Sequence, residues 1–216
     1  MQGCRNHFPF TDQKFKTRPK VYAGFIADLW ARGLIRFDAE AETTVGVFHV
    51  PKKGGRQRLA VDARVANCHL IEPRHVALPT AAAMSNLECD IGDIGDNLWA
   101  AQIYVDNAFY RIAMPAGMEH CFVLPPVRVR RLVEAGVEIP VELSALTTVS
   151  PLMMVLPMGF NWALYFCQKI LEGAVLKGGW PASALIKDRR VPPIVGDGNV
   201  VGVWTAWRSS GTARRA

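Results

Sequence analysis

The sequence predicts a mixed α+β fold, because helix-like and strand-like apolar patterns alternate along it. Val21, Phe25, Leu29 and Trp30 recur at helical spacing. Residues 45–50 and 59–61 are short apolar runs on either side of a Gly-Gly turn, which is typical of a β-hairpin. With 216 residues, 50% of them hydrophobic, the chain is long enough to bury a core in one domain, or in one domain and a smaller lobe.

The N-terminal elements are expected to follow a loose basic lead-in at residues 1–20, which has no apolar period. The helix that starts at Val21 should end at Gly33, because glycine accepts the left-handed conformation that closes many helices. An extended segment then begins at Leu34. In the hairpin that follows, Gly54 and Gly55 supply the positive φ angles of a tight turn.

The central stretch, residues 101–115, predicts a buried strand that runs into a tight turn. Ile103 and Val105 supply β-branched bulk, whereas Asp106 and Asn107 place polar groups at the end of the strand. A strand of this kind delivers side chains to a site at its C-terminal tip.

Several further elements are expected in the rest of the chain. A short helix is predicted at 80–84, strands at 121–124 and 153–156, and a helix from the capping residue Asn161 to about Leu176. Residues 192–203 read as strand, turn and strand with Asp197 at the bend, and residues 208–216 as a disordered tail.

The apolar run at residues 149–167 approaches the length of a membrane span. Pro151, Pro157 and Gly159 interrupt it, so it is interpreted as buried core, and no membrane association is expected.

The chain carries a formal net charge of +6, with basic residues in separate clusters along it. A polyanion such as nucleic acid is one expected partner, and a set of solvated charged surfaces is the alternative. Five cysteines without a CxxC pair favour a reducing compartment, and the N-terminus has no apolar signal-peptide core. We therefore expect an intracellular protein that is not secreted.

Four motifs in order resemble the reverse transcriptase domain of retroelements. Residues 50–67, VPKKGGRQRLAVDARVAN, are similar to the family's fingers hairpin, "VPKKDGKWRxxVDYRxLN". Residues 101–115 resemble the first palm motif, "LDLKNAFYQIxM", and residues 156–168, LPMGFNWALYFCQ, resemble "LPFGLxxAPxxFQ". Residues 195–198, VGDG, stand in the place of "YxDD".

This resemblance implies a fingers-like region at 21–98 and a palm-like region at 99–207, with an antiparallel palm sheet packed on helices. Because the sequence stops soon after Val203, we expect the thumb and RNase H portions to be absent. The implied activity is RNA-directed DNA synthesis, with RNA or an RNA–DNA hybrid and a deoxynucleotide triphosphate as partners.

The resemblance also implies a nucleotide site. The matching positions are Lys52, Lys53 and Arg58 for the triphosphate, Asn107 and Ala108 for the backbone beneath it, Phe109 for the sugar, and Met158 and Gly159 beside the nucleotide and template. Lysine and arginine suit a polyanionic triphosphate, since arginine forks onto phosphate oxygens and lysine adds a point charge.

The catalytic positions depart from the family pattern. Tyr104 stands where the family has a metal-binding Asp, and Gly198 replaces the second acidic residue beside Asp197. Nucleotidyl transfer uses two divalent ions about 4 Å apart, Mg²⁺ or Mn²⁺, held by oxygen ligands, and a neutral phenol is a poor ligand. Loss of one ligand is expected to cost on the order of a thousandfold in rate.

Three hypotheses follow. The first is a degenerate, inactive reverse-transcriptase-like fragment. The second is a non-catalytic nucleic-acid-binding module that uses the basic fingers and residues 128–131. The third is an active polymerase in which Asp106 replaces Tyr104 as a ligand beside Asp197, since residues two apart on a strand share a face.

Overall fold

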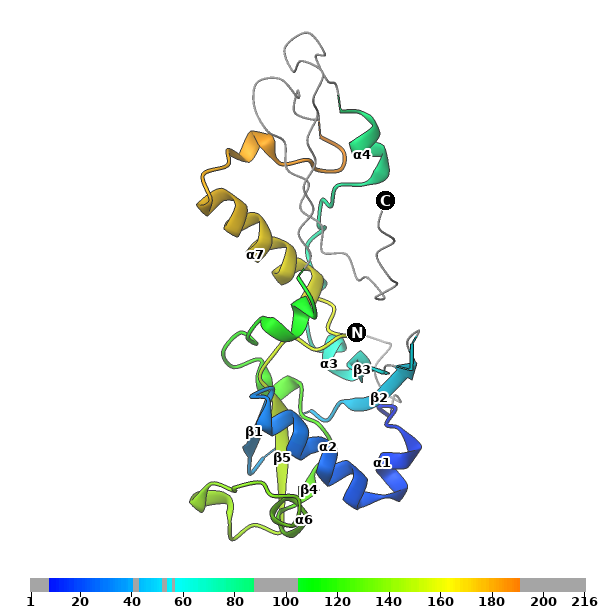
Figure 1. Cartoon of the computed structure of the whole chain (residues 1–216), viewed down its shortest axis with the longest axis vertical. Coiled ribbons are helices and arrows are strands. Elements are labelled where there is room, and N and C mark those ends of the chain that lie inside the picture. Colours follow the sequence, from blue (N-terminus) through cyan, green and yellow to red (C-terminus); the bar gives the residue numbers. More distant parts are fainter. Residues whose placement is uncertain (1–7, 41–42, 52–53, 56, 88–104, 191–216) are drawn as a thin grey trace. The chain divides into compact units, whose positions relative to one another are not determined.

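The computed structural model describes residues 8–40, 43–51, 54–55, 57–87 and 105–190. Its helices and strands are labelled in Figure 1. The chain divides into two compact units. Among the described residues, the first unit comprises 8–40, 43–51, 54–55, 57–72 and 109–163, and the second comprises 73–87, 105–108 and 164–190.

The first unit contains two small antiparallel sheets among its described residues. Strand β5 (Thr148–Met153) lies between β1 (Ile35–Asp38) and β4 (Val127–Arg128) in the larger sheet. Strands β2 (Gly46–Pro51) and β3 (Gln57–Asp62) form the other. The helical elements around them are α1 (Gln13–Thr17), α2 (Pro19–Ala31), α3 (Arg64–Cys68), η1 (Ala108–Arg111, which begins at the unit boundary), η2 (Glu119–Cys121), α6 (Val129–Glu134) and η3 (Val141–Leu143).

The strand predicted at 153–156 was wrong in its position. The observed strand β5 passes through Pro151, which pairs with Phe37 of β1. Proline has no N–H to donate, but the Pro151 carbonyl accepts a 2.8 Å hydrogen bond from the Leu124 backbone N–H. Val155, inside the predicted range, forms only an isolated bridge with Ala113.

The strand predicted at 121–124 is likewise not a continuous strand. Cys121 ends η2, and Val123 makes isolated bridges with Thr44 and Leu152. Residues 122–124 are nevertheless completely buried, so the apolar pattern located the core correctly. The largest fully buried side chains of the first unit are Phe122, Ile26, Leu124, Leu132, Leu152, Met153, Leu156, Val45, Val47, Val123 and Val149.

Helix α2 confirms the predicted N-terminal helix. Pro19 opens it at a position where no backbone donor is needed, and Gly33 closes it with φ +67°. Tyr22, Ile26 and Leu29 are spaced along its buried face, and the helix packs against α6 and the larger sheet.

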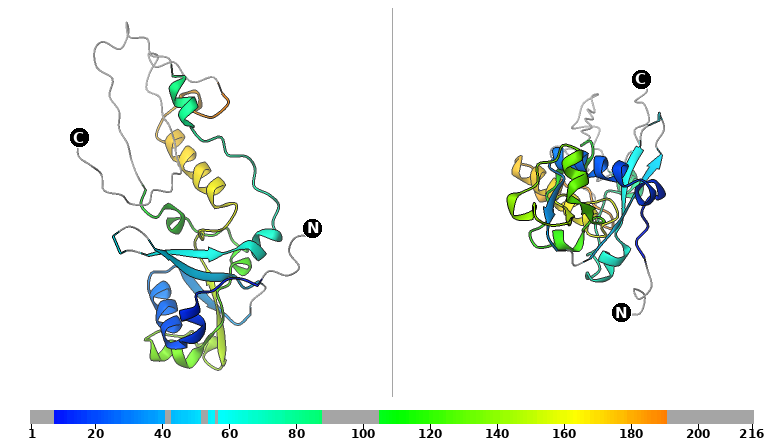
Figure 2. Two further views of the ribbon diagram at one scale, coloured as in Figure 1. Left: turned by 90° about the vertical axis from the view of Figure 1, so that its right-hand side faces the viewer. Right: turned by 90° about the horizontal axis from the view of Figure 1, so that it is seen from below.

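The predicted hairpin is confirmed by β2 and β3, which lie side by side in antiparallel register (Figure 2). Gly54 and Gly55 have φ +82° and +72°, as the turn requires. Val47 and Val61 pair with each other and are both buried, whereas Pro51 and Gln57 at the other end of the hairpin are exposed.

The N-terminal segment was expected to be loose up to residue 20, but part of it is ordered. The Asp12 side chain caps α1 by accepting a 2.9 Å hydrogen bond from the Lys14 backbone N–H. Phe15 is buried, stacks on Phe25 at 4.8 Å and meets the edge of His49. Aromatic packing therefore joins α1 and α2 to the hairpin.

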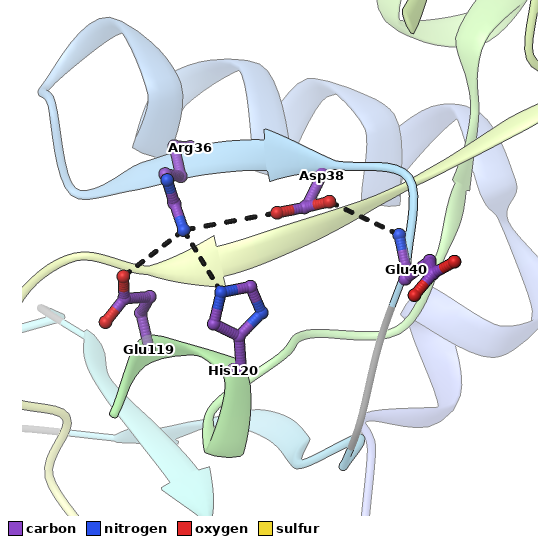
Figure 3. A network of polar contacts seen from close by, with 5 residues as sticks. All are labelled: Arg36, Asp38, Glu40, Glu119 and His120. Atoms are coloured by element: carbon purple, nitrogen blue, oxygen red, sulfur yellow. Dashed lines mark hydrogen bonds and ion pairs between the residues drawn. The ribbon is translucent and has the colours of Figure 1, made fainter. Parts of the chain in front are cut away.

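A polar network joins β1 to η2 (Figure 3). The Arg36 guanidinium donates a 3.2 Å hydrogen bond to Glu119 and lies 3.3 Å from the Nε2 atom of His120. Asp38 lies 4.0 Å from the same guanidinium and accepts from the Glu40 backbone N–H. Because the Arg36 side chain is 46% exposed, the network orients η2 more than it stabilises the fold.

The second unit includes α4 (Ala81–Ser85), most of α7 (Ala163–Lys177) and η4 (Ala182–Ala184). Both helices were predicted, but Asn161 was wrong as the cap of α7, because its side-chain oxygen is buried without a hydrogen-bond partner. Thr80 caps α4 and also bonds to Asp188 at 3.1 Å. The buried carboxylate of Glu172 accepts from Gln168 and Lys169 at 3.0 Å. Lys187, 3.5 Å away, pairs with the same carboxylate.

The described residues also bear on membrane crossing and on the state of the cysteines. None of their helices is both long enough and apolar enough to cross a membrane. The cysteine pattern favoured reduced thiols, and this was wrong for Cys68, which is disulfide-bonded, whereas Cys121 and Cys167 carry free thiols.

Candidate functional site

Three segments of the first unit meet around Tyr110 of η1. The Tyr110 hydroxyl donates a 2.9 Å hydrogen bond to the Leu59 carbonyl oxygen of β3. It also accepts a hydrogen bond from the Met158 backbone N–H. One phenol therefore joins η1, the hairpin strand and the turn that follows Leu156.

The pKa of Tyr110 reports the surroundings of this hydroxyl. Burial raises that pKa to about 12, and the Met158 hydrogen bond and the positive charge of Arg58 partly oppose the rise. The phenol is therefore neutral at pH 7, and the guanidinium of Arg58 is close enough to lower its pKa. We call the group Arg58, Tyr110, Met158 and Gly159 the Tyr110 site.

The turn at Met158 and Gly159 lies directly against β3. The Val61 backbone N–H donates a 3.0 Å hydrogen bond to the Met158 carbonyl oxygen. Gly159 has φ +122°, and a Cβ atom there would collide with the Val61 carbonyl oxygen. Glycine is thus required both by the conformation and by the close approach.

Asn67 of α3 fixes the same turn from the other side. Its side-chain amide donates a 2.8 Å hydrogen bond to the Gly159 carbonyl oxygen and accepts one of 3.1 Å from the Asn161 backbone N–H. Trp162 donates a 2.7 Å hydrogen bond to the Ile71 carbonyl oxygen. Side chains therefore satisfy backbone groups that the turn leaves outside a sheet ladder.

Asp62 and Arg64 form a paired fork at the end of β3. Two guanidinium nitrogens of Arg64 donate to the two carboxylate oxygens at 2.8 and 2.7 Å. This bond to Arg64, joined by one from the Phe10 backbone N–H, lowers the pKa of the buried Asp62 to about 2 against the opposing effect of burial. The carboxylate is therefore ionised at neutral pH.

A shallow pocket of about 350 Å³ opens beside this fork. Its walls combine two aromatic rings with the charged pair and the Gly159 turn. The lining residues are Phe10, Phe48, Val61, Asp62, Ala63, Arg64 and Gly159. The Asp62 carboxylate and the Arg64 guanidinium balance each other's charge, so this open pocket offers aromatic surface and a paired guanidinium, which suit a flat ring.

The structure brings together several of the residues that the sequence singled out. Arg58 and Met158 both act on Tyr110, and Gly159, which follows Met158, lies against Val61 of β3. Phe109 precedes Tyr110 in η1 and is half-buried.

Asp106, Asn107 and Ala108 belong to the second unit. Asp106 and Asn107 form the predicted turn, in which Asn107 has φ +52°. Asp106 is exposed and accepts a 2.9 Å hydrogen bond from the Asn107 side chain. Lys52, Lys53, Tyr104 and Asp197 lie outside the described residues, as do residues 101–104 of the predicted buried strand. Val105, predicted as part of that strand, is 40% exposed and lies in no strand, so the prediction was wrong at this residue.

Sequence reasoning missed Tyr110, Asp62, Arg64 and Asn67 as site residues. A signal was present, because Asp62, Arg64 and Asn67 occupy matching positions of the hairpin motif, whose last letters are "VDYRxLN". The roles we find for them are structural: they fix a turn and the end of a strand.

No group of three or more His, Cys, Asp or Glu side chains in the described part of the chain is arranged to hold a metal ion.

Comparison with solved structures identifies the fold. A foamy viral protease–reverse transcriptase dRH in complex with double-stranded DNA matches with a TM-score of 0.50 at 13% identity. The match covers 82% of this chain and 26% of that one. The fold is reverse-transcriptase-like. Another foamy viral protease–reverse transcriptase structure with double-stranded DNA has a TM-score of 0.48 at 14% identity, over 82% of this chain and 30% of that chain.

The comparison supports the predicted α+β class and a reverse-transcriptase-like fold. This chain spans less than a third of the length of either viral protein. No protein-family model matches the sequence, and no curated protein matches it either.

Proposed function

We propose that this chain is a reverse-transcriptase-like fragment of a retroelement that binds nucleic acid and has lost template-directed DNA synthesis. The observation that carries the proposal is the Tyr110 site. Arg58 and Met158, at family nucleotide-contact positions, act on the half-buried Tyr110 phenol, and Gly159, at a third such position, lies against β3 in a reverse-transcriptase-like fold.

The chemistry of the site favours a phosphate-bearing ligand. Arg58 contributes a guanidinium beside Tyr110, and the Arg64 side chain is 56% exposed although it is paired with Asp62. The net charge of +6 adds a long-range attraction for polyanions. Two viral proteins with similar folds are described in complex with double-stranded DNA. We propose RNA or an RNA–DNA hybrid as the ligand, with a deoxynucleotide triphosphate as a weaker one.

The residues at the family's metal-binding positions argue against retained catalysis. The family chemistry requires Mg²⁺ or Mn²⁺, which supplies charge neutralisation for the leaving pyrophosphate when bound. Tyr104 presents a neutral phenol where a carboxylate is needed, and Asp197 has Gly198 as its neighbour. The residues present do not fit a two-ion site, so we derive no catalytic step through a metal.

Primer extension on an RNA template separates the proposal from an active polymerase. We expect no incorporation by the wild-type chain with either Mg²⁺ or Mn²⁺, while a labelled RNA–DNA hybrid still binds. Incorporation that disappears in Asp197→Ala but persists in Asp28→Ala, an exposed control on α2, would show that Asp106 and Asp197 hold metal and would overturn the loss of synthesis.

A further inference from the structure

The N-terminal segment of residues 8–17, which we call the N-terminal strap, is seated on the base of the hairpin. The Phe10 backbone N–H donates a 2.7 Å hydrogen bond to the Asp62 carboxylate. The Asp12 backbone N–H donates one of 2.9 Å to the Val47 carbonyl oxygen. The Phe10 ring meets Phe48 edge to face at 5.4 Å. Three independent contacts thus fix the strap on β2 and β3.

The hairpin is shaped to receive this strap. Gly46 pairs with Asp62 across the two strands, and a Cβ atom on Gly46 would collide with the Phe10 backbone. Gly46 therefore leaves room for the Phe10 backbone, and the Asp62 carboxylate accepts a hydrogen bond from the same backbone. A loose lead-in would need neither feature.

Asp62 connects the strap to the pocket. Its carboxylate is buried and accepts both from the Phe10 backbone and from the two nitrogens of the Arg64 fork. Phe10 and Arg64 both line the pocket of about 350 Å³. A single buried anion consequently sets the position of an aromatic wall and of a cationic wall.

We propose that Asp62 is a positioning residue, which holds the N-terminal strap and the Arg64 guanidinium in place as two walls of a nucleic-acid-binding pocket. The identity of the ligand rests on the proposed function above, whereas the coupling of the strap to Asp62 rests on the contacts alone. The strap is in this view part of the binding surface.

The first arm of the test measures the strap directly, by hydrogen exchange of the Phe10 amide in the ¹⁵N-labelled full chain. Asp62→Asn leaves one neutral acceptor oxygen for the Phe10 and Arg64 donors, so the Phe10 bond is either lost or becomes a weaker bond to an uncharged amide. We expect the Phe10 amide to exchange on the order of tenfold faster in this variant, because a bond to a charged group is lost. Asp62→Glu, which keeps the charge, should restore part of the protection, and Asp28→Asn on the exposed face of α2 should change nothing.

The second arm measures affinity for a fluorescein-labelled RNA–DNA hybrid with a single-stranded RNA overhang, in two variants of the same strap. Phe10→Ala removes a pocket wall and should weaken binding roughly fivefold, by the lost aromatic contact. Phe8→Ala, at a side chain that is 91% exposed, is the matched control and should bind like the wild type. Because Phe10 is itself 54% exposed, this variant should fold even if Asp62→Asn does not.

The two experiments test the positioning role and the proposed function independently of each other. If the wild-type chain does not bind the hybrid, the proposed function fails, and the Phe10 amide still decides whether Asp62 holds the strap. A Phe10 amide that exchanges equally fast in folded wild type and Asp62→Asn would overturn the positioning role. Equal hybrid affinities of Phe10→Ala and Phe8→Ala would overturn the strap as a wall of the pocket.

Discussion

The Tyr110 hydroxyl and the Leu59 carbonyl oxygen, 51 residues apart in the chain, are joined by a 2.9 Å hydrogen bond. The bond ties the helical turn η1 to the central part of β3, and the Met158 backbone contacts the same hydroxyl. A phenol with its pKa raised to about 12 by burial remains a donor at any physiological pH. The geometry of the Tyr110 site therefore does not depend on pH in that range.

Tyr110→Phe should lower the free energy of unfolding by about 1 to 2 kcal/mol, because the Leu59 carbonyl and the Met158 N–H both lose their partner. Urea denaturation followed by tryptophan fluorescence measures the change. Tyr165→Phe is the control, since its ring faces the Lys169 ammonium at 5.9 Å and keeps that contact without the hydroxyl. Equal stability of the Tyr110→Phe variant and the wild type would show that the hydroxyl does not hold the site together.

Gly159→Ala should destabilise the chain by more than Gly117→Ala. Both glycines have positive φ, +122° and +85°, but only at Gly159 would the added Cβ collide with a carbonyl oxygen. We expect a cost of about 1 kcal/mol from the backbone conformation alone at Gly117, and about 2 to 4 kcal/mol at Gly159. Thermal unfolding of the two variants side by side gives the difference. A smaller cost at Gly159 than at Gly117 would mean that the turn does not approach β3 closely.

Acid should remove a stabilising contribution that Asp62 makes. Its pKa falls from the ordinary 3.8 to about 2, mainly through the hydrogen bond with Arg64. A folded-state pKa below the unfolded value means that the stabilisation is complete above about pH 3.8 and is lost as the pH falls toward 2. Asp62→Asn should therefore flatten the dependence of unfolding free energy on pH in this window, whereas Asp28→Asn should leave it as steep as in the wild type.

Tyr104→Asp should give the chain measurable affinity for Mn²⁺, because it places a carboxylate where the family binds metal. Titration followed by electron paramagnetic resonance of free Mn²⁺ measures the gain. Tyr104→Asn, which has the same shape without the charge, should not bind. A correctly folded Tyr104→Asp chain that binds no more Mn²⁺ than Tyr104→Asn would show that the alignment of residues 101–115 with the first palm motif is wrong.

Local patterns in the sequence predicted the elements that local chemistry determines. Helix α2 has apolar residues at helical spacing and ends at Gly33, and the hairpin has two glycines with positive φ. Thr80 was predicted to open a short helix, and its side chain caps α4. Each of these rests on residues that are neighbours in the chain.

The misplaced and missed features depend on contacts between distant residues. Pro151 argued against a central strand, yet its carbonyl finds a partner in Leu124, which restores one side of the pairing. The contact of Phe10 with Asp62 spans 52 residues and gives no periodic signal in residues 1–20. Likewise, the buried positions of α7 include Cys167, Gln168 and Glu172, whereas the apolar Ile170 is 50% exposed.

The candidate site was predicted from motif positions, which identified Arg58, Phe109, Met158 and Gly159. The residues that fix those positions in space, above all Tyr110 and Asn67, became evident from hydrogen bonds to backbone groups far away in the sequence. Hydrogen bonds of this kind produce no regular spacing in the sequence, because many residue types can supply the side-chain donor and any backbone carbonyl can accept.

The most direct test of the central claim is the affinity of the full chain for an RNA–DNA hybrid as a function of salt. We predict that the logarithm of the association constant falls linearly with the logarithm of salt concentration, and that Arg58→Ala reduces the slope by about one phosphate contact. Arg32→Ala, at the exposed end of α2, should leave the slope unchanged. A salt-independent affinity, or equal slopes for Arg58→Ala and the wild type, would contradict phosphate-led binding at the Tyr110 site.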